Sequence, residues 1–293
     1  MRADRCVCPN ARSRLRKLGL IAGGGTLPVE IAEHCRRSGR PLLVIRLKGF
    51  AGAGLEPFAG VEVGLAELGK CFKALRRAGC EAVCLAGQVN RPDFATLMPD
   101  LRGMAALPAA IAAARHGDDA LLRMLVGEFE KEGFAVEGAH EVMDDLAVGK
   151  GPLGRVAPGS AHGADIDQAL AAAHAVGRLD AGQAAVVCRG LVLALEAAEG
   201  TDALLARVAD LPEALRGRPG APEGVLAKTP KPIQETRVDL PTIGPATVEA
   251  AARAGLAGIV GEVGRLLVLD REAVIALADD LGIFILGVEP RAP

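Results

Sequence analysis

Short apolar runs alternate with longer amphipathic stretches along the first half of the chain. The runs at 17–22 (KLGLIA), 41–47 (PLLVIRL) and 81–86 (EAVCLA) have the length and continuous hydrophobicity of strands buried on both faces. Between them, residues 29–37 and 67–78 have the spacing of helices. Strands separated by helical lengths predict parallel β-α-β units with right-handed crossovers. We therefore predict a Rossmann-like parallel sheet domain at residues 15–143.

A second region of regular pattern follows an irregular one. Residues 144–164 contain several glycines and prolines and follow neither period, which predicts a linker. Helical spacing returns at 165–179, 202–211, 247–254 and 271–281. Runs of strand length lie among these helices, at 184–195, 225–227, 259–260, 266–269 and 283–288. The fold class is thus α/β, with a C-terminal mixed α/β domain at 165–293, and we expect the active site in the cleft between the two domains.

Composition and charge exclude several classes of protein. The chain has 293 residues, half of them hydrophobic, which is enough for two domains with sizeable cores. It has 34 Lys+Arg against 36 Asp+Glu and neither Trp nor Tyr, so it lacks the basic surface and the stacking side chains of nucleic-acid-binding proteins. We therefore expect no nucleic-acid partner.

The apolar runs, the N-terminal residues and the cysteines of the sequence bear on its localisation. No apolar run approaches the roughly 18 residues that span a bilayer. Residues 1–14 are basic without the apolar segment of a secretory signal, and we predict a disordered extension there. Seven scattered cysteines are typical of reduced thiols. We expect a cytoplasmic protein.

The glycine-rich turn after the first predicted strand is the first candidate binding site. Backbone N–H groups at Gly24, Gly25, Thr26 and Leu27 lie where a strand leads into a helix, an arrangement that favours a phosphate. The turn departs from the dinucleotide fingerprint because Pro28 stands in place of the third glycine. A tight turn without a ligand is the alternative.

The loop at residues 87–93 (GQVNRPD) directly follows the third predicted strand. Ligands of open α/β sheets bind at the carboxyl ends of the strands, so we expect this loop to face the same crevice as the glycine turn. Its candidate contacts to a base, ribose or phosphate are Gly87, Asn90 and Arg91. The alternative is a surface turn stiffened by proline.

The segment at 228–244 (KTPKPIQETRVDLPTIG) combines prolines with closely spaced charges. Its prolines prevent a regular helix and stiffen the backbone. Cations neutralise phosphate oxygens during phosphoryl transfer, and a carboxylate holds Mg²⁺ or orients the attacking water. We predict catalytic roles for Lys228, Arg237 and Asp239, a substrate contact at Gln234, and Asp239 as a metal ligand. A solvated charged loop is the alternative.

Two further candidates follow the apolar run at 184–195. Thr201 and Asp202 stand at the start of a predicted helix, which either side chain would cap. Because they also follow a strand end, we predict Thr201 as a substrate contact and Asp202 as a second ligand of the metal.

Seven segments, in this order, resemble the UDP-2,3-diacylglucosamine pyrophosphatase family, of the type unrelated to metallophosphoesterases. The resemblance extends from about residue 15 to residue 288. The segments are KLGLIAGGGTLPVEIAEHC, GQVNRPDF, GDDALLR, EGAHEVM, VVCRGLVLALEAAEGTDALLARV, VLAKTPKPIQETRVDLPTIG and GLAGIVGEVGRLLVLDREAVIALAD.

The resemblance implies Mg²⁺-dependent hydrolysis of UDP-2,3-diacylglucosamine to UMP and 2,3-diacylglucosamine 1-phosphate (lipid X), a step of lipid A synthesis. It implies that water attacks the phosphorus nearer the sugar, and that the two domains close over this acylated UDP-sugar. The family's catalytic aspartate falls at Asp239. We expect a cytoplasmic enzyme that makes transient, peripheral contact with the inner leaflet of the membrane, and a homo-oligomer is left open.

Two other functions remain as alternatives. The β-α-β pattern with its glycines also suggests an NAD(P)-dependent oxidoreductase, although the second strand ends near Arg46 and Lys48, where an acidic residue for a ribose hydroxyl is expected. The second alternative is a non-catalytic nucleotide-sensing module. It would bind UMP or a UDP-sugar without turnover.

Overall fold

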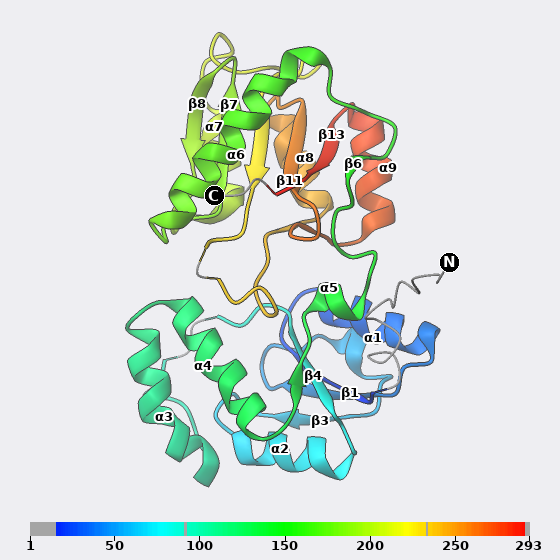
Figure 1. Cartoon of the computed structure of the whole chain (residues 1–293), viewed down its shortest axis with the longest axis vertical. Helices are drawn as coiled ribbons and strands as arrows, with labels where there is room; N and C mark the ends of the chain where they lie inside the picture. The colour runs from blue at the N-terminus through cyan, green and yellow to red at the C-terminus, as the bar shows by residue number, and fades with distance from the viewer. Residues whose placement is uncertain (1–15, 91–92, 233, 291–293) are drawn as a thin grey trace, which may run out of the picture. The chain divides into compact units, whose positions relative to one another are not determined.

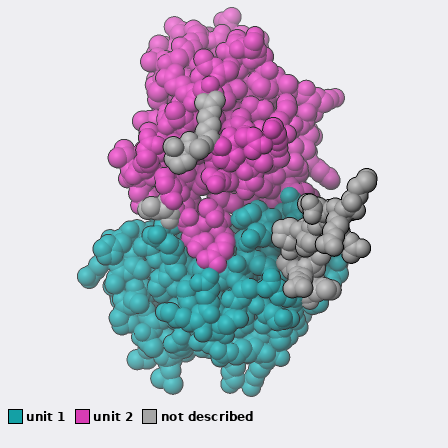
Figure 2. Space-filling model, viewed as in Figure 1, with its two compact units in different colours: residues 1–144 teal, residues 145–293 magenta. Residues whose placement is uncertain are grey.

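The computed structural model describes residues 16–90, 93–232 and 234–290. The chain divides into two compact units, residues 1–144 and 145–293 (Figure 2). The predicted extension at 1–14 and the candidate residue Arg91 lie outside the described residues.

Unit 1 contains a parallel five-stranded sheet in the order β3-β2-β1-β4-β5 (Figure 1). This all-parallel sheet confirms the Rossmann-like prediction. From β1 the chain adds strands first on one side (β2, β3) and then on the other (β4, β5), and sheets of this kind bind ligands at the switch point between β1 and β4. The elements are β1 (Leu18–Ala22), α1 (Leu27–Ser38), β2 (Leu42–Leu47), a 3-10 turn (Ala53–Leu55), β3 (Gly60–Val63), α2 (Leu68–Arg77), β4 (Ala82–Ala86), α3 (Leu101–Ala114), α4 (Asp118–Lys131), β5 (Ala135–Val136) and α5 (Ala139–Val142).

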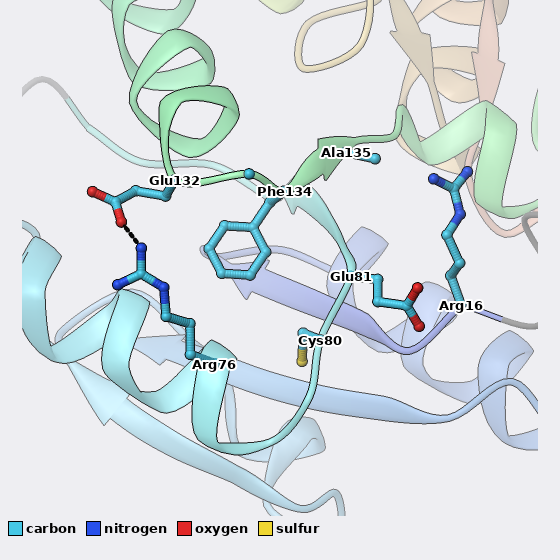
Figure 3. A pocket seen from close by; sticks show the side chains of 8 residues that line it. Arg16, Arg76, Cys80, Glu81, Glu132, Phe134 and Ala135 are labelled. Carbon is cyan, nitrogen blue, oxygen red and sulfur yellow. Dashed lines mark hydrogen bonds and ion pairs between the residues drawn. The ribbon is translucent and has the colours of Figure 1, made fainter.

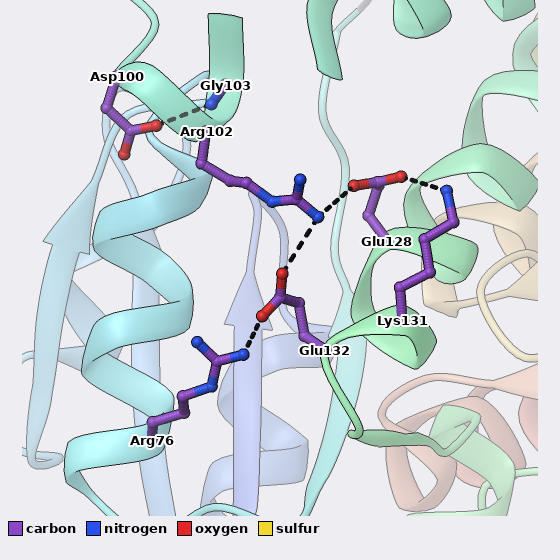
Figure 4. A network of polar contacts seen from close by, with 7 residues as sticks. All are labelled: Arg76, Asp100, Arg102, Gly103, Glu128, Lys131 and Glu132. Carbon is purple, nitrogen blue, oxygen red and sulfur yellow. Dashed lines mark hydrogen bonds and ion pairs between the residues drawn. The ribbon is translucent and has the colours of Figure 1, made fainter. Parts of the chain in front are cut away.

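Helix α3 was not predicted, because its sequence has almost no polar face and contains Pro108. Its start is fixed by Asp100, whose carboxylate accepts a hydrogen bond of 2.8 Å from the Gly103 amide. Arg102 then pairs with Glu128 and Glu132, at 3.1 Å each, and ties α3 to the last turn of α4 and the residue after it (Figure 4). Tertiary contacts rather than a helical period therefore define this helix.

The turn after β1 needs glycine at its first position. A Cβ atom added to Gly23 would lie 2.7 Å from the Gln88 carbonyl oxygen and 3.0 Å from the Gly87 carbonyl carbon. These are backbone atoms of the loop after β4, so a side chain would push two neighbouring strand ends apart. At Gly25 the requirement is instead the positive φ of 84°.

We expect Gly23→Ala to lower the free energy of unfolding by about 1–3 kcal/mol, because the backbone must move to admit the methyl group. Urea unfolding followed by circular dichroism measures this loss. Gly52→Ala is the matched control, since Gly52 has φ −78° and no heavy atom within 4 Å of an added Cβ. Equal unfolding midpoints for the two variants would contradict this account of the turn.

Unit 2 contains a six-stranded mixed sheet in the order β6-β13-β11-β9-β7-β8. Strands β13, β11 and β9 are parallel, while β6, β7 and β8 pair antiparallel with their neighbours, which confirms the mixed α/β prediction. The elements are β6 (Gly151–Leu153), a 3-10 turn (Ser160–His162), α6 (Gly163–Arg178), β7 (Ala184–Cys188), β8 (Leu191–Leu195), α7 (Gly200–Ala209), β9 (Val225–Lys228), β10 (Thr242–Ile243), α8 (Pro245–Arg253), β11 (Gly258–Glu262), β12 (Leu267–Val268), α9 (Arg271–Leu281) and β13 (Phe284–Val288).

Helices cover both faces of this sheet. Ile166, Ala169 and Ala173 of α6 form a core with Val187, Val225 and Val260 on one face. On the opposite face, α7, α8 and α9 pack over Val186, Leu226 and Ile259. Residues of β9 therefore alternate between the α6 face and the α7–α8–α9 face, as the pleat requires.

Two parts of unit 2 differ from the sequence prediction. The run at 184–195 is a hairpin of two strands, because Arg189 and Gly190 adopt positive φ angles and Asp165 accepts hydrogen bonds from both their amides, at 2.8 and 2.7 Å. The predicted linker at 144–164 contains β6, which pairs antiparallel with β13. Both differences arise from partners distant in the sequence.

Candidate functional site

Several predicted site residues of unit 2 lie at one edge of its sheet. Strand β9 ends at Lys228, and β8, which runs in the same direction, ends at Leu195, next to Glu196. The first residue of β7 between them, Ala184, pairs with Lys228. Lys228 and Glu196 therefore come together at the carboxyl edge, where parallel sheets carry their ligands.

Lys228 is a buried cation among carboxylates. The residue is 5% exposed, and its Nζ donates a hydrogen bond of 2.8 Å to the Thr242 carbonyl oxygen. Burial lowers the pKa of the ammonium, and the charges of Glu196, Asp202 and Asp239 oppose this shift. The structure thus brings three predicted residues, Lys228, Asp202 and Asp239, into one electrostatic neighbourhood.

Asp239 is held by Gln234. The buried Gln234 accepts a hydrogen bond of 2.8 Å from the Lys231 amide through its Oε1, and its Nε2 donates to Oδ2 of Asp239. Because the first contact fixes which way the amide points, the second presents a donor to the carboxylate. Gln234 is therefore placed to orient Asp239, a role different from the substrate contact that we predict from the sequence.

Glu196 also belongs to the candidate site, although it is not among the residues predicted from the sequence. Its Oε2 accepts a hydrogen bond from the Gln183 amide and its Oε1 accepts one from Thr201 Oγ1, both of 2.7 Å. The Thr201 hydroxyl is thus used to hold Glu196 and does not cap α7, which begins at Gly200 without a side-chain cap. Asp202 is exposed in the first turn of that helix.

The remaining cations of the 228–244 segment already have acidic partners. Arg237 donates from Nε and Nη2 to the two carboxylate oxygens of Glu235, at 2.9 and 2.8 Å. Lys231 pairs with Asp180 at 2.8 Å. A phosphate bound by Arg237 would compete with Glu235, so Lys228 is the better placed of the two predicted catalytic cations.

The donor set suits a magnesium ion that shares its ligands with a phosphate. In the described ranges, no three side chains of the His, Cys, Asp and Glu types are grouped closely enough to hold a metal by themselves. Mg²⁺ is usually bound by one or two carboxylates together with substrate phosphates and water. Asp202 and Asp239, which both act on Lys228, supply carboxylates of this kind.

In unit 1, the two predicted binding loops meet at the carboxyl edge of neighbouring strands. Gly24 and Gln88 exchange backbone hydrogen bonds of 2.8 and 2.9 Å, which join the turn after β1 to the loop after β4. The Gly24 amide is therefore engaged, and Gly25 and Thr26 are exposed beside it. The other described candidates here are Leu27, which is half-buried, and Gly87 and Asn90, which are exposed.

Comparison with known proteins identifies the family. The family model described as the LpxI N-terminal domain matches residues 17–146, and the one described as the LpxI C-terminal domain matches residues 149–286. UDP-2,3-diacylglucosamine pyrophosphatase LpxI of Caulobacter vibrioides is 66% identical over 277 residues, which cover 94% of this chain and 99% of that protein. This chain belongs to the LpxI family.

A similarity to a solved structure is much weaker. The match to the solved structure of CobK precorrin-6A reductase covers 95% of this chain and 90% of the reductase chain, with a TM-score of 0.31 and 16% sequence identity. So weak a similarity indicates neither the fold nor the function of this chain.

A separate pocket of about 410 Å³ lies at the opposite edge of the unit 1 sheet (Figure 3). Arg16 and Glu81, which line it, precede β1 and β4, so the pocket is at the amino edge. Two of its charged residues, Arg76 and Glu132, pair with each other. Because the glycine turn follows β1, this pocket does not belong to the candidate site.

The five cysteines in the described part of the chain are not candidate nucleophiles. The thiols of Cys35, Cys71, Cys80, Cys84 and Cys188 are buried and unpaired by disulfides. Burial raises the pKa of Cys35 to about 11 and that of Cys71 to about 12. A thiol with such a pKa is almost entirely protonated at neutral pH and is a poor nucleophile.

Proposed function

We propose that this chain hydrolyses the diphosphate of UDP-2,3-diacylglucosamine in lipid A synthesis, with Mg²⁺, to UMP and 2,3-diacylglucosamine 1-phosphate. Its membership of the LpxI family supports the reaction class and the acylated UDP-sugar substrate. The observation that carries the proposal is the buried Lys228 ammonium beside Asp239 at the carboxyl edge of unit 2. A cation and an oriented carboxylate are what transfer of a phosphoryl group to water requires.

The proposed roles follow from the contacts. The Lys228 ammonium neutralises non-bridging oxygens of the diphosphate, and burial strengthens this attraction because little water screens it. Asp239, oriented by Gln234, accepts a hydrogen bond from the attacking water. The charge of Glu196 favours the protonated form of Lys228, against the effect of burial, and Thr201 holds Glu196 in place.

The bonds change as follows. The water oxygen bonds to the phosphorus nearer the sugar, and the bond from this phosphorus to the bridging oxygen breaks. The bridging oxygen leaves with UMP, and the water protons pass to solvent. Asp202 and Asp239 are the residues that would hold Mg²⁺, which supplies further positive charge to the diphosphate when bound.

We propose that the uridine nucleotide binds at the carboxyl edge of unit 1. The exposed Gly25 and Thr26 at the start of α1 offer amides at the positive end of the helix dipole, and Asn90 stands in the adjoining loop. The Gly24 amide already donates to the Gln88 carbonyl oxygen, so the amides of Gly25 and Thr26 are the ones proposed to bind the nucleotide.

We also propose that the enzyme works in the cytoplasm, in peripheral contact with the inner leaflet. None of the described helices is long and apolar enough to cross a bilayer. A substrate with two acyl chains resides in a membrane, so the enzyme has to reach it there.

Incubation of the purified chain with UDP-2,3-diacylglucosamine in water labelled with ¹⁸O tests the reaction. We expect UMP to appear with Mg²⁺ and not with a chelator, and the label to enter the sugar phosphate rather than UMP. No Mg²⁺-dependent UMP would reject the proposal. Label in UMP would show attack at the other phosphorus.

The same preparation separates the two alternatives. Single-turnover conditions that yield a bound but uncleaved UDP-sugar would favour a nucleotide-sensing module. Micromolar binding of NAD(H) or NADP(H) without hydrolysis would favour an oxidoreductase.

A further inference from the structure

Helix α3 of unit 1 exposes a continuous apolar stripe. Leu101 is 87% exposed and Met104 is 58% exposed, and Met98, just before the helix, is 86% exposed. The exposed residues of the helix recur at spacings of three and four, so they share one side of it. The apolar α3 face consists of Leu101, Met104, Ala105, Pro108, Ala109 and Ala112.

The packing of this helix is inverted relative to an ordinary surface helix. Its buried positions carry the small residues Gly103, Ala106 and Ala114. Of its larger apolar residues, Leu101 and Met104 are exposed, and Leu107 and Ile111 are half-buried. A Cβ on Gly103 would lie 1.8 Å from the Ala66 carbonyl oxygen, so the helix is seated too closely for a larger residue. The exposed Leu101 and Met104 therefore contribute little to the fold of unit 1.

Charges near the apolar α3 face lie at its ends. Asp100 is used as the N-terminal cap, and Arg102 points toward Glu128 and Glu132 of the neighbouring segment (Figure 4). Residues 103–114 contain no charged side chain. Beyond them, Arg115 and His116 are exposed at the C-terminal end of the helix. An apolar stripe next to a cation suits acyl chains beside anionic headgroups.

We propose that the apolar α3 face docks on an anionic lipid bilayer and lies in its interface. This inference rests on the proposed function, because a substrate with two acyl chains brings the enzyme to a membrane. The face is the outer side of one helix, and from Leu101 to Ala112 it extends roughly 16 Å, at 1.5 Å per residue. Insertion would bury Leu101 and Met104 among acyl chains and place Arg115 at the headgroups.

The absence of Trp and Tyr from the chain allows a direct test. Met104→Trp introduces a single indole in the apolar α3 face of the full-length chain. With vesicles of phosphatidylethanolamine and phosphatidylglycerol, we expect its fluorescence to shift to shorter wavelength and to be quenched by brominated lipid. Leu281→Trp, at a 43% exposed position of α9 in unit 2, is the matched control and should show neither change.

A second pair of variants measures what the face contributes. Leu101→Gln with Met104→Gln should lower sedimentation with these vesicles by roughly tenfold or more, since two apolar side chains are lost from the interface. Leu215→Gln with Leu281→Gln removes the same kind of side chain from exposed sites in unit 2 and should bind as wild type. Both double variants should hydrolyse a dispersed, short-chain substrate at the wild-type rate.

Three results would overturn the docking proposal. The first is that the wild-type protein does not sediment with the vesicles. The second is that the two double variants bind the vesicles equally. The third is a blue shift of Met104→Trp that depends on protein concentration without lipid, which would show that a second copy covers the face. Vesicle binding is measured without turnover, so a chain that binds but does not hydrolyse would reject the proposed function and not the docking.

Discussion

Asp239→Asn is expected to lower kcat on the order of 10³-fold, with a much smaller change in KM. The substitution keeps the shape of the side chain and a hydrogen-bonding partner for Gln234, but it removes the negative charge. In the proposed mechanism that charge orients the attacking water and contributes to holding Mg²⁺, and both effects act mainly on the transition state. Initial rates of UMP release at saturating substrate and Mg²⁺ measure the loss.

The matched control for Asp239 is Asp280→Asn, which removes an exposed carboxylate from α9 of the same unit. It should leave kcat within about twofold of wild type, since surface changes away from a site have small effects. Circular dichroism of both variants should be that of the wild type. An Asp239→Asn enzyme that is folded and nearly as active as the control would remove Asp239 from the proposed chemistry.

The parts of the fold that could be predicted are those specified by local sequence. The run that forms β1, the glycines after it and the proline at the start of α1 each act within a few residues, so a strand, a tight turn and a helix could be read in order. Parallel pairing followed from the helical lengths between strands. The carboxyl-edge rule then placed the loops after β1 and β4 side by side, and the Gly24–Gln88 bridge confirms that placement.

The parts that could not be predicted depend on contacts between distant residues. Asp165 stabilises the turn at Arg189 and Gly190, and without that contact an unbroken apolar run looks like one strand. Helix α3 has small residues where a helical period would show large ones. In each case the tertiary partner, and not the local pattern, decides the structure.

In the candidate site, too, some residues could be predicted from the local sequence and others depend on contacts between distant residues. The prolines and charges of the 228–244 segment led to the prediction of Lys228 and Asp239, because such a composition fits neither a linker nor a core strand. Glu196 was not assigned, because only the pairing of β7 with both β8 and β9 brings it to the same edge as Lys228.

Strand register also separates Lys228 from Glu262, a further buried charge at this edge. Lys228 pairs with Gly261 and shares its face, so Glu262, one residue on, points to the α6 side, where His174 contacts it at 3.0 Å. A shift of one residue in β11 would place Glu262 on the same face of the sheet as Lys228.

Lys228→Met is expected to lower kcat/KM on the order of 10²- to 10³-fold, because it removes the buried cation on which the charges of Glu196, Asp202 and Asp239 act. The remaining carboxylates would then repel the diphosphate. Lys150→Met, which removes a lysine whose side chain is 74% exposed, is the matched control and should be nearly as active as wild type.

The pH dependence of kcat/KM distinguishes a role of the Lys228 charge from a role in packing. Burial lowers the pKa of this ammonium below its ordinary value of 10.5, so the cation is present at low pH and is lost as pH rises through the lowered pKa. The wild-type profile should therefore fall on its alkaline side at a pH below 10.5. In Lys228→Arg the guanidinium stays protonated in this range, so whatever activity that variant keeps should lack the alkaline fall. An unchanged alkaline limb in Lys228→Arg would assign the titration to another group and leave Lys228 a structural role.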